Sequence, residues 1–111
     1  MKLQGLFIAA VLMVSTPAAM AYKGDAAAGK EKSAVCAACH GADGNSAIPV
    51  NPSLAGQNYS YLVQVLKDYR SGARKNPIMN GQAAGLSDED IQNLAKYYST
   101  QSGKLVALPA R

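Results

Sequence analysis

The segment VCAACHGADG holds both cysteines and the one histidine of this 111-residue chain. Cys36 and Cys39 stand three positions apart, and His40 follows directly. Two thiols at this spacing lie on one turn of helix, where each can form a thioether with one of the two vinyl groups of a haem. His40 then lies under the iron and can offer an imidazole nitrogen. The Cys-x-x-Cys-His pattern is therefore typical of covalent attachment of a c-type haem.

Three other interpretations of these residues explain less. A disulfide between Cys36 and Cys39 gives no role to His40. A thioredoxin-like redox pair is expected in a βαβ context, and the chain has no strand pattern of useful length. A structural zinc site takes four protein ligands, so two cysteines and one histidine would need a carboxylate to join them.

The second face of a haem iron needs another ligand, and the chain has no second histidine. Met79 is the only methionine beyond residue 21, where the leader peptide described below is predicted to end. A lone methionine often fills a core, but Met79 lies in NPIMNG, on no apolar stripe. We predict that a loop free of helix brings Met79 to the iron as second axial ligand. Histidine and methionine together raise the reduction potential and favour electron transfer, and they leave no open position for a substrate, so we expect no enzyme activity.

The N-terminus has the pattern of a secretory signal peptide over residues 1–21. A positive start is followed by an apolar run from Leu3 to Val14 and then by an A-x-A cleavage site at residues 19–21. The run is shorter than the ~20 residues that a membrane-spanning helix needs. We therefore predict export to the periplasm, cleavage after Ala21 and no stable membrane insertion of the mature chain, residues 22–111.

The apolar periodicity predicts an all-α fold with three main helices. Asp25 can cap a first helix over residues 26–35, which leads into the cysteines. Residues 59–70 carry an apolar stripe at helical spacing. Ser87 can cap a last helix, which we expect over residues 87–101.

The remaining stretches, residues 41–58 and 71–86, are rich in glycine, proline and asparagine, and we expect them to be loops. The mature chain is short enough for one domain. It has few large apolar side chains, which suggests that a cofactor helps to fill the core. The whole chain has 11 Lys and Arg against 7 Asp and Glu. No run of basic residues of the kind that tracks phosphates occurs, so no nucleic-acid partner is expected.

The chain resembles the class I cytochromes c, and especially one domain of the bacterial dihaem cytochromes c of the c-four type. The segments that carry the resemblance follow the family's order: GDAAAGKEKSAVCAACHGADGNS, PSLAGQ, YLVQVLKDYRSGAR and LSDEDIQNLAKYYSTQ. The resemblance implies three helices around one covalently bound haem c. It also implies that the Pro52 carbonyl accepts the Nδ1–H of His40, and that Gly29 lets the first helix cross the last closely at Tyr97. This chain has one Cys-x-x-Cys-His where the dihaem proteins have two.

These features together predict a periplasmic electron carrier that exchanges single electrons with transient redox protein partners. Two alternatives remain: a haem subunit of a larger exported oxidoreductase, and a haem-based ligand sensor with a labile sixth ligand. Arg74 is a candidate partner for a haem propionate, since arginine suits carboxylates. A solvated cation just past a helix end is an equally good interpretation of Arg74.

Overall fold

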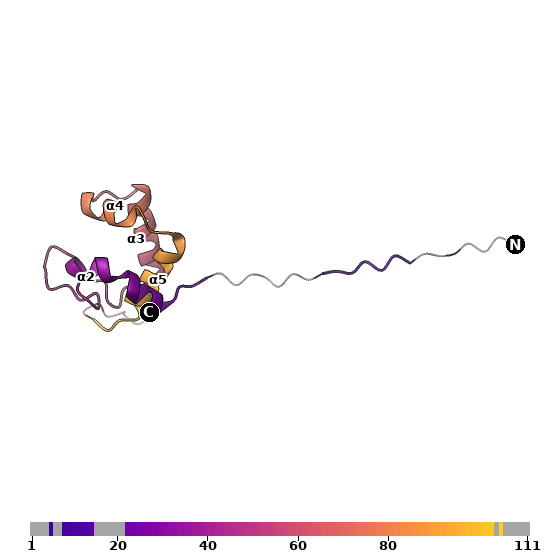
Figure 1. Cartoon of the computed structure of the whole chain (residues 1–111), viewed down its shortest axis with the longest axis horizontal. Helices are drawn as coiled ribbons and strands as arrows, with labels where there is room; N and C mark the ends of the chain where they lie inside the picture. Colours follow the sequence, from indigo (N-terminus) through magenta and orange to yellow (C-terminus); the bar gives the residue numbers. More distant parts are fainter. Residues whose placement is uncertain (1–4, 6–7, 15–21, 104, 106–111) are drawn as a thin grey trace, which may run out of the picture.

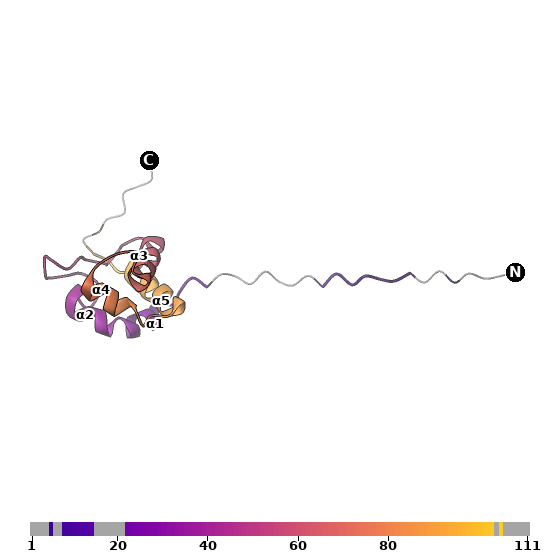
Figure 2. The same ribbon diagram turned by 90° about the horizontal axis from the view of Figure 1, so that it is seen from above.

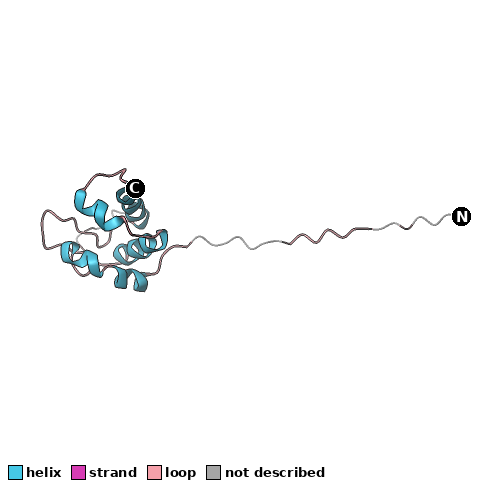
Figure 3. Cartoon of the chain, turned by 45° about the horizontal axis from the view of Figure 1, so that its top comes forward, coloured by secondary structure: helices cyan, strands magenta, loops and turns pink. Residues whose placement is uncertain are grey.

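The computed structural model of the chain describes residues 5, 8–14, 22–103 and 105. Within these residues the chain forms helices and loops without a strand (Figure 3), so the predicted all-α class is confirmed. The five helices are α1 (Ala26–Lys32), α2 (Ala34–His40), α3 (Tyr59–Ser71), α4 (Pro77–Ala83) and α5 (Asp88–Ser99). The predicted cleavage site at residues 19–21 lies outside the described residues.

The helix predicted over residues 26–35 is two short helices that meet at Ser33. Asp25 caps α1 as expected, because its carboxylate accepts a hydrogen bond of 2.9 Å from the amide of Ala28. The Ser33 hydroxyl donates to the carbonyl of Lys30 at 2.7 Å. Such a bond from a serine side chain to a nearby carbonyl competes with the regular helical pattern, and α2 begins afresh at Ala34.

Both long helices begin and end close to where the sequence signals place them. Asn58 caps α3 with a hydrogen bond of 3.1 Å from the amide of Tyr61. Gly72 ends the helix with a φ of 84°, a backbone conformation that is unfavourable for residues with a Cβ atom. Ser87 and Asp90 form a reciprocal capping box at the start of α5.

The prediction of an irregular loop over residues 71–86 is wrong, because α4 lies within it. The Asn76 carboxamide accepts hydrogen bonds of 3.0 Å from the amides of both Ile78 and Met79. Pro77 occupies the first helical position, where its fixed φ favours a helix and its missing N–H costs nothing. Met79 is consequently a helical residue.

α1 crosses α5 closely at Gly29, as the resemblance implies. A Cβ added at Gly29 would lie 2.0 Å from the carbonyl oxygen of Asn93 and 2.8 Å from the Cβ of Tyr97. No side chain larger than hydrogen fits there without a shift of the backbone. The core beside this crossing is a cluster of buried residues from α3 and α5: Leu62, Leu94, Ala95, Tyr97 and Tyr98.

Two further contacts between helices complete the fold. α5 also packs on α3, and α4 packs on the end of α3. In Figure 1, α2 and α4 lie apart from each other, with α3 and α5 joining them along one side. Figure 2 shows the long loop between α2 and α3 extending beyond the helices. Among the described residues, no helix has the length and apolar character needed to cross a membrane.

Candidate haem site

Both cysteines lie on α2 with free thiols. Cys36 is half-buried, and this burial raises the pKa of its thiol. Cys39 is exposed. The described cysteines form no disulfide, and no group of three or more His, Cys, Asp or Glu among the described residues is arranged to hold a metal ion. The disulfide and zinc interpretations therefore have no geometric support in this part of the chain.

His40 is the last residue of α2 and is buried. Its Nδ1 lies 2.7 Å from the carbonyl oxygen of Pro52, so the contact expected from the resemblance is present. A carbonyl can only accept, which places the proton on Nδ1. The lone pair of the neutral ring is then on Nε2, the nitrogen available to a metal, and the hydrogen bond fixes the orientation of the ring.

Met79 is half-buried on α4 and lines the same cavity as His40, and α2 and α4 lie apart in Figure 1. Asn80, the next residue, fastens α4 to the end of α3. Its Nδ2 donates to the carbonyls of Tyr69 and Arg74, both at 2.8 Å, and its Oδ1 accepts from the amide of Asn76 at 2.9 Å. These three bonds hold the segment that carries Met79, and Asn80 is a positioning residue that the sequence analysis missed.

The cavity between these helices has a volume of about 420 Å³. This is within the ~300–1,000 Å³ typical of small-molecule and cofactor sites. Side chains from α2, α3, α4 and α5 line it, and the loop before α3 closes another side. The lining residues include Cys36, Cys39, His40, Pro52, Leu66, Tyr69, Arg74, Met79, Leu94 and Tyr98.

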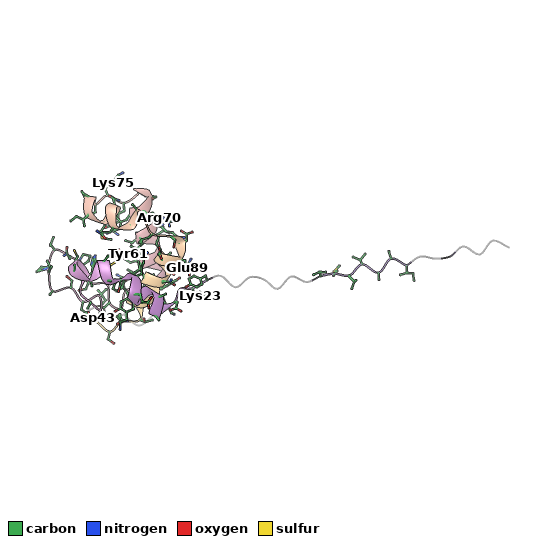
Figure 4. The ribbon with its side chains drawn as sticks, in the orientation of Figure 1. Lys23, Asp43, Tyr61, Arg70, Lys75 and Glu89 are labelled. Carbon is green, nitrogen blue, oxygen red and sulfur yellow. The ribbon has the colours of Figure 1, made fainter. Side chains whose placement is uncertain are left out.

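Arg74 is exposed at the edge of this cavity, between α3 and α4. Its guanidinium lies 5.0 Å above the centre of the Tyr69 ring, and its Nη1 donates to the Tyr61 hydroxyl at 3.5 Å. Tyr61 is labelled in Figure 4. Neither of the two ion pairs in the described part of the chain involves Arg74. The guanidinium therefore forms no ion pair with a carboxylate of the described residues, although the charge of Asp68 acts on it, and it lies where it could meet an acidic group of a bound cofactor.

The donors in the cavity fit a c-type haem. Two free thiols and an imidazole nitrogen come from α2, and a thioether comes from α4. In addition, the Tyr98 hydroxyl is buried in this cavity and has no hydrogen-bond partner among the described residues. Buried hydroxyls are usually paired, so this unpartnered donor is a second sign that the polar surroundings of the cavity are completed only when a group is bound there.

Comparison with known proteins identifies the class. The family profile described as Cytochrome c matches residues 26–102. The chain is also 51% identical over 81 residues to cytochrome c-554(548) of Halomonas halodenitrificans, an alignment that covers 70% of this chain and 98% of the relative. The chain therefore belongs to the cytochrome c family, with the class I fold, one covalently bound haem c and an electron-transfer function.

Two further relatives place the chain within that family. The crystal structure of reduced recombinant cytochrome c4 from Pseudomonas stutzeri superposes with a TM-score of 0.70 at 45% identity. That match covers 74% of this chain and 48% of the other, so this chain spans about half of that protein. The cytochrome subunit of sulfide dehydrogenase from Chlorobaculum tepidum is 39% identical over 69 residues, covering 62% of each chain. The resemblance to one domain of the c-four type is confirmed.

Proposed function

We propose that this protein is a periplasmic electron carrier whose haem is bound by Cys36 and Cys39 and ligated by His40 and Met79. The observation that carries the proposal is the shared cavity, which is lined by His40 from α2 and by Met79 from α4. When bound, the haem supplies an iron that accepts and releases one electron. The residues of this chain hold it, exclude water from it and keep both axial positions filled.

Each ligand has a distinct task in this proposal. The thiols of Cys36 and Cys39 add across the two vinyl groups, so that each S–H proton ends on carbon and each sulfur becomes a thioether. The Nε2 of His40 binds one face of the iron, while Pro52 holds the other ring nitrogen. The sulfur of Met79 binds the second face. Because both ligands stay in place, little rearrangement accompanies the gain or loss of an electron.

Periplasmic location follows from the predicted signal peptide, residues 1–21, and the mature domain is then residues 22–111. We propose cleavage after Ala21, because the A-x-A pattern stands there. The partners are then exported redox proteins that dock transiently, with no role for nucleic acid and no catalytic residue. We also assign Arg74 to a haem propionate, because its guanidinium lies at the edge of the cavity and is in neither ion pair of the described residues.

Two measurements on one preparation test the proposal. The protein is produced with its signal peptide in a host with working haem-ligation machinery. Intact-mass analysis should give residues 22–111 plus one haem, and the ferric protein should show the weak far-red absorption band of a methionine–iron bond. A mass without haem would refute the proposed attachment. A haem protein without the far-red band, which binds carbon monoxide readily when reduced, would instead be a ligand sensor.

A second function is favoured by one observation, the likeness to the cytochrome subunit of a sulfide dehydrogenase. In that case the chain would pass electrons inside a larger exported oxidoreductase. Size-exclusion chromatography of the native extract separates the two functions. A carrier elutes at the size of the purified protein, whereas a subunit elutes with a larger complex.

A further inference from the structure

Tyr98 has a hydroxyl that the protein buries and leaves without a partner. Its side chain is 3% exposed and lines the haem cavity beside Leu94 and Cys36. By distance and angle the hydroxyl oxygen makes no hydrogen bond with a described residue, although Ser33 and Cys36 lie near it. The adjacent Tyr97 shows the ordinary arrangement, since its hydroxyl donates to the Ala42 carbonyl at 2.9 Å. The two neighbouring tyrosines therefore differ in whether the hydroxyl has a hydrogen-bond partner.

The ring of Tyr98 is held in place by what surrounds it. Gly44, with a φ of 85°, packs so closely that a Cβ added there would lie 2.7 Å from the ring of Tyr98. The Tyr97 ring lies on another side, with centroids 5.1 Å apart and planes inclined at 53°. The hydroxyl is thus directed by packing on both sides of the ring.

Two polar groups are near this hydroxyl, those of Ser33 and Cys36. The Ser33 hydroxyl donates its own proton to the Lys30 carbonyl, so toward Tyr98 it could act only as an acceptor. The Cys36 sulfur, once it is part of a thioether, has no proton and can only accept a hydrogen bond. Burial raises the pKa of Tyr98, so its hydroxyl keeps its proton throughout the physiological range and remains a donor.

We propose that the Tyr98 hydroxyl donates a hydrogen bond to the thioether sulfur of Cys36 and thereby raises the reduction potential of the haem. The positive end of the O–H dipole then points toward the macrocycle. In an interior of low dielectric, that dipole stabilises the reduced form over the more positive oxidised form. The inference rests on the proposed function, because it needs Cys36 to be one of the two attachment points. Tyr98 is a positioning residue, and it has no contact with the iron.

The experiment compares Tyr98→Phe with Tyr97→Phe in the haem-loaded protein. Both variants lose one hydroxyl from adjacent buried rings of α5. Equilibrium redox titration should give a lower potential for Tyr98→Phe, with haem content and the far-red band retained. Tyr97→Phe should keep the wild-type potential, although it loses the bond to Ala42. Equal potentials for wild type and Tyr98→Phe, or equal shifts in both variants, would overturn the inference.

A second measurement uses the wild-type protein and so does not depend on a variant that folds. The reduced, low-spin protein is diamagnetic, so proton NMR can observe the Tyr98 hydroxyl directly. We expect a slowly exchanging hydroxyl proton with an Overhauser effect to the β-protons of Cys36. A hydroxyl proton in contact with other groups only would contradict the proposal. A preparation without attached haem would refute the proposed function as well, whereas an unchanged potential refutes this inference alone.

Discussion

The side chains of His40 and Met79 are held in position to different extents by the residues around them. The ring of His40 is fixed by the 2.7 Å bond from Nδ1 to Pro52, so Nε2 is offered in one orientation. A bond of this kind also makes the imidazole a more basic ligand. The thioether of Met79 has no N–H or O–H to donate, so it cannot be fixed by a bond of the kind that holds His40. Its position depends on α4, and the two axial ligands should therefore differ in how easily they are lost.

Replacement of the weaker ligand tests its identity. We expect Met79→Ala to lose the far-red band, to bind carbon monoxide when reduced and to have a lower reduction potential, because methionine is the ligand that raises it. Absorption spectra and redox titration measure these changes. Ile78→Ala is the matched control, since the neighbouring Ile78 is 68% exposed and lines the same cavity. Met79→Ala with an unchanged spectrum and potential would exclude Met79 as a ligand.

At the scale of the helices, α4 is the element on which the second ligand depends. The Asn76 cap starts it, and Asn80 ties it to the end of α3 through the carbonyls of Tyr69 and Arg74. α4 has seven residues, fewer than an isolated helix needs to be stable in water. Its hold on Met79 is therefore the sum of a few hydrogen bonds and its packing on α3.

Loss of the cap should consequently free Met79 before the rest of the protein unfolds. Asn76→Ala removes the acceptor for the amides of Ile78 and Met79, which should cost about 1 kcal/mol. In a denaturant titration, the far-red band should disappear at a lower concentration than the helical circular dichroism. Asn58→Ala removes the comparable cap of α3 and serves as the control. In that variant the two signals should disappear together. Coincident loss in Asn76→Ala would contradict this account.

The crossing of α1 and α5 gives a prediction about stability. In Gly29→Ala the new methyl group would overlap the carbonyl oxygen of Asn93, at 2.0 Å, so the helices must separate. We expect the free energy of unfolding to fall by ~1–3 kcal/mol, the usual cost of overpacking. Gly81→Ala is the control, because that helical glycine has no atom within 4 Å of an added Cβ. It should gain ~0.5–1 kcal/mol. Thermal unfolding of both proteins measures the difference.

The local signals in the sequence predicted the long helices and the attachment motif because each depends on residues close together in the chain. The α4 helix also has local signals, but these signals conflict, and the helix was therefore missed. Asn76 and Pro77 are a readable start signal, but the glycines around them favoured a loop. The tie made by Asn80 and the orphaned hydroxyl of Tyr98 were beyond sequence reasoning. Each depends on tertiary contacts, and periodicity predicts that Tyr98 is buried without saying what its hydroxyl meets.

For the whole molecule, the net charge of the mature haem protein is closer to zero than the composition of the full chain suggests. The full chain has a formal charge of +4. Removal of Lys2 with the leader lowers it to about +3, and two ionised haem propionates lower it to about +1. Two ion pairs also neutralise charges on neighbouring helices, Lys32 with Asp90 at 3.3 Å and Arg70 with Asp88 at 2.7 Å. In Figure 4 the labelled charged residues of both signs are distributed over the fold: Lys23, Asp43, Arg70, Lys75 and Glu89.

A net charge this small should steer partners weakly over long distances. We expect the rate of electron transfer with a small anionic redox reagent to change by no more than about twofold as salt rises from ~0.01 to ~0.1 M, where the Debye length falls from ~30 to ~10 Å. Stopped-flow kinetics measures the rate. Lys75→Glu, at an exposed position, lowers the net charge to about −1 and should reverse the sign of the small salt effect. A steep fall in the wild-type rate would mean that a local cluster of charge, rather than the net charge, guides docking at the haem edge.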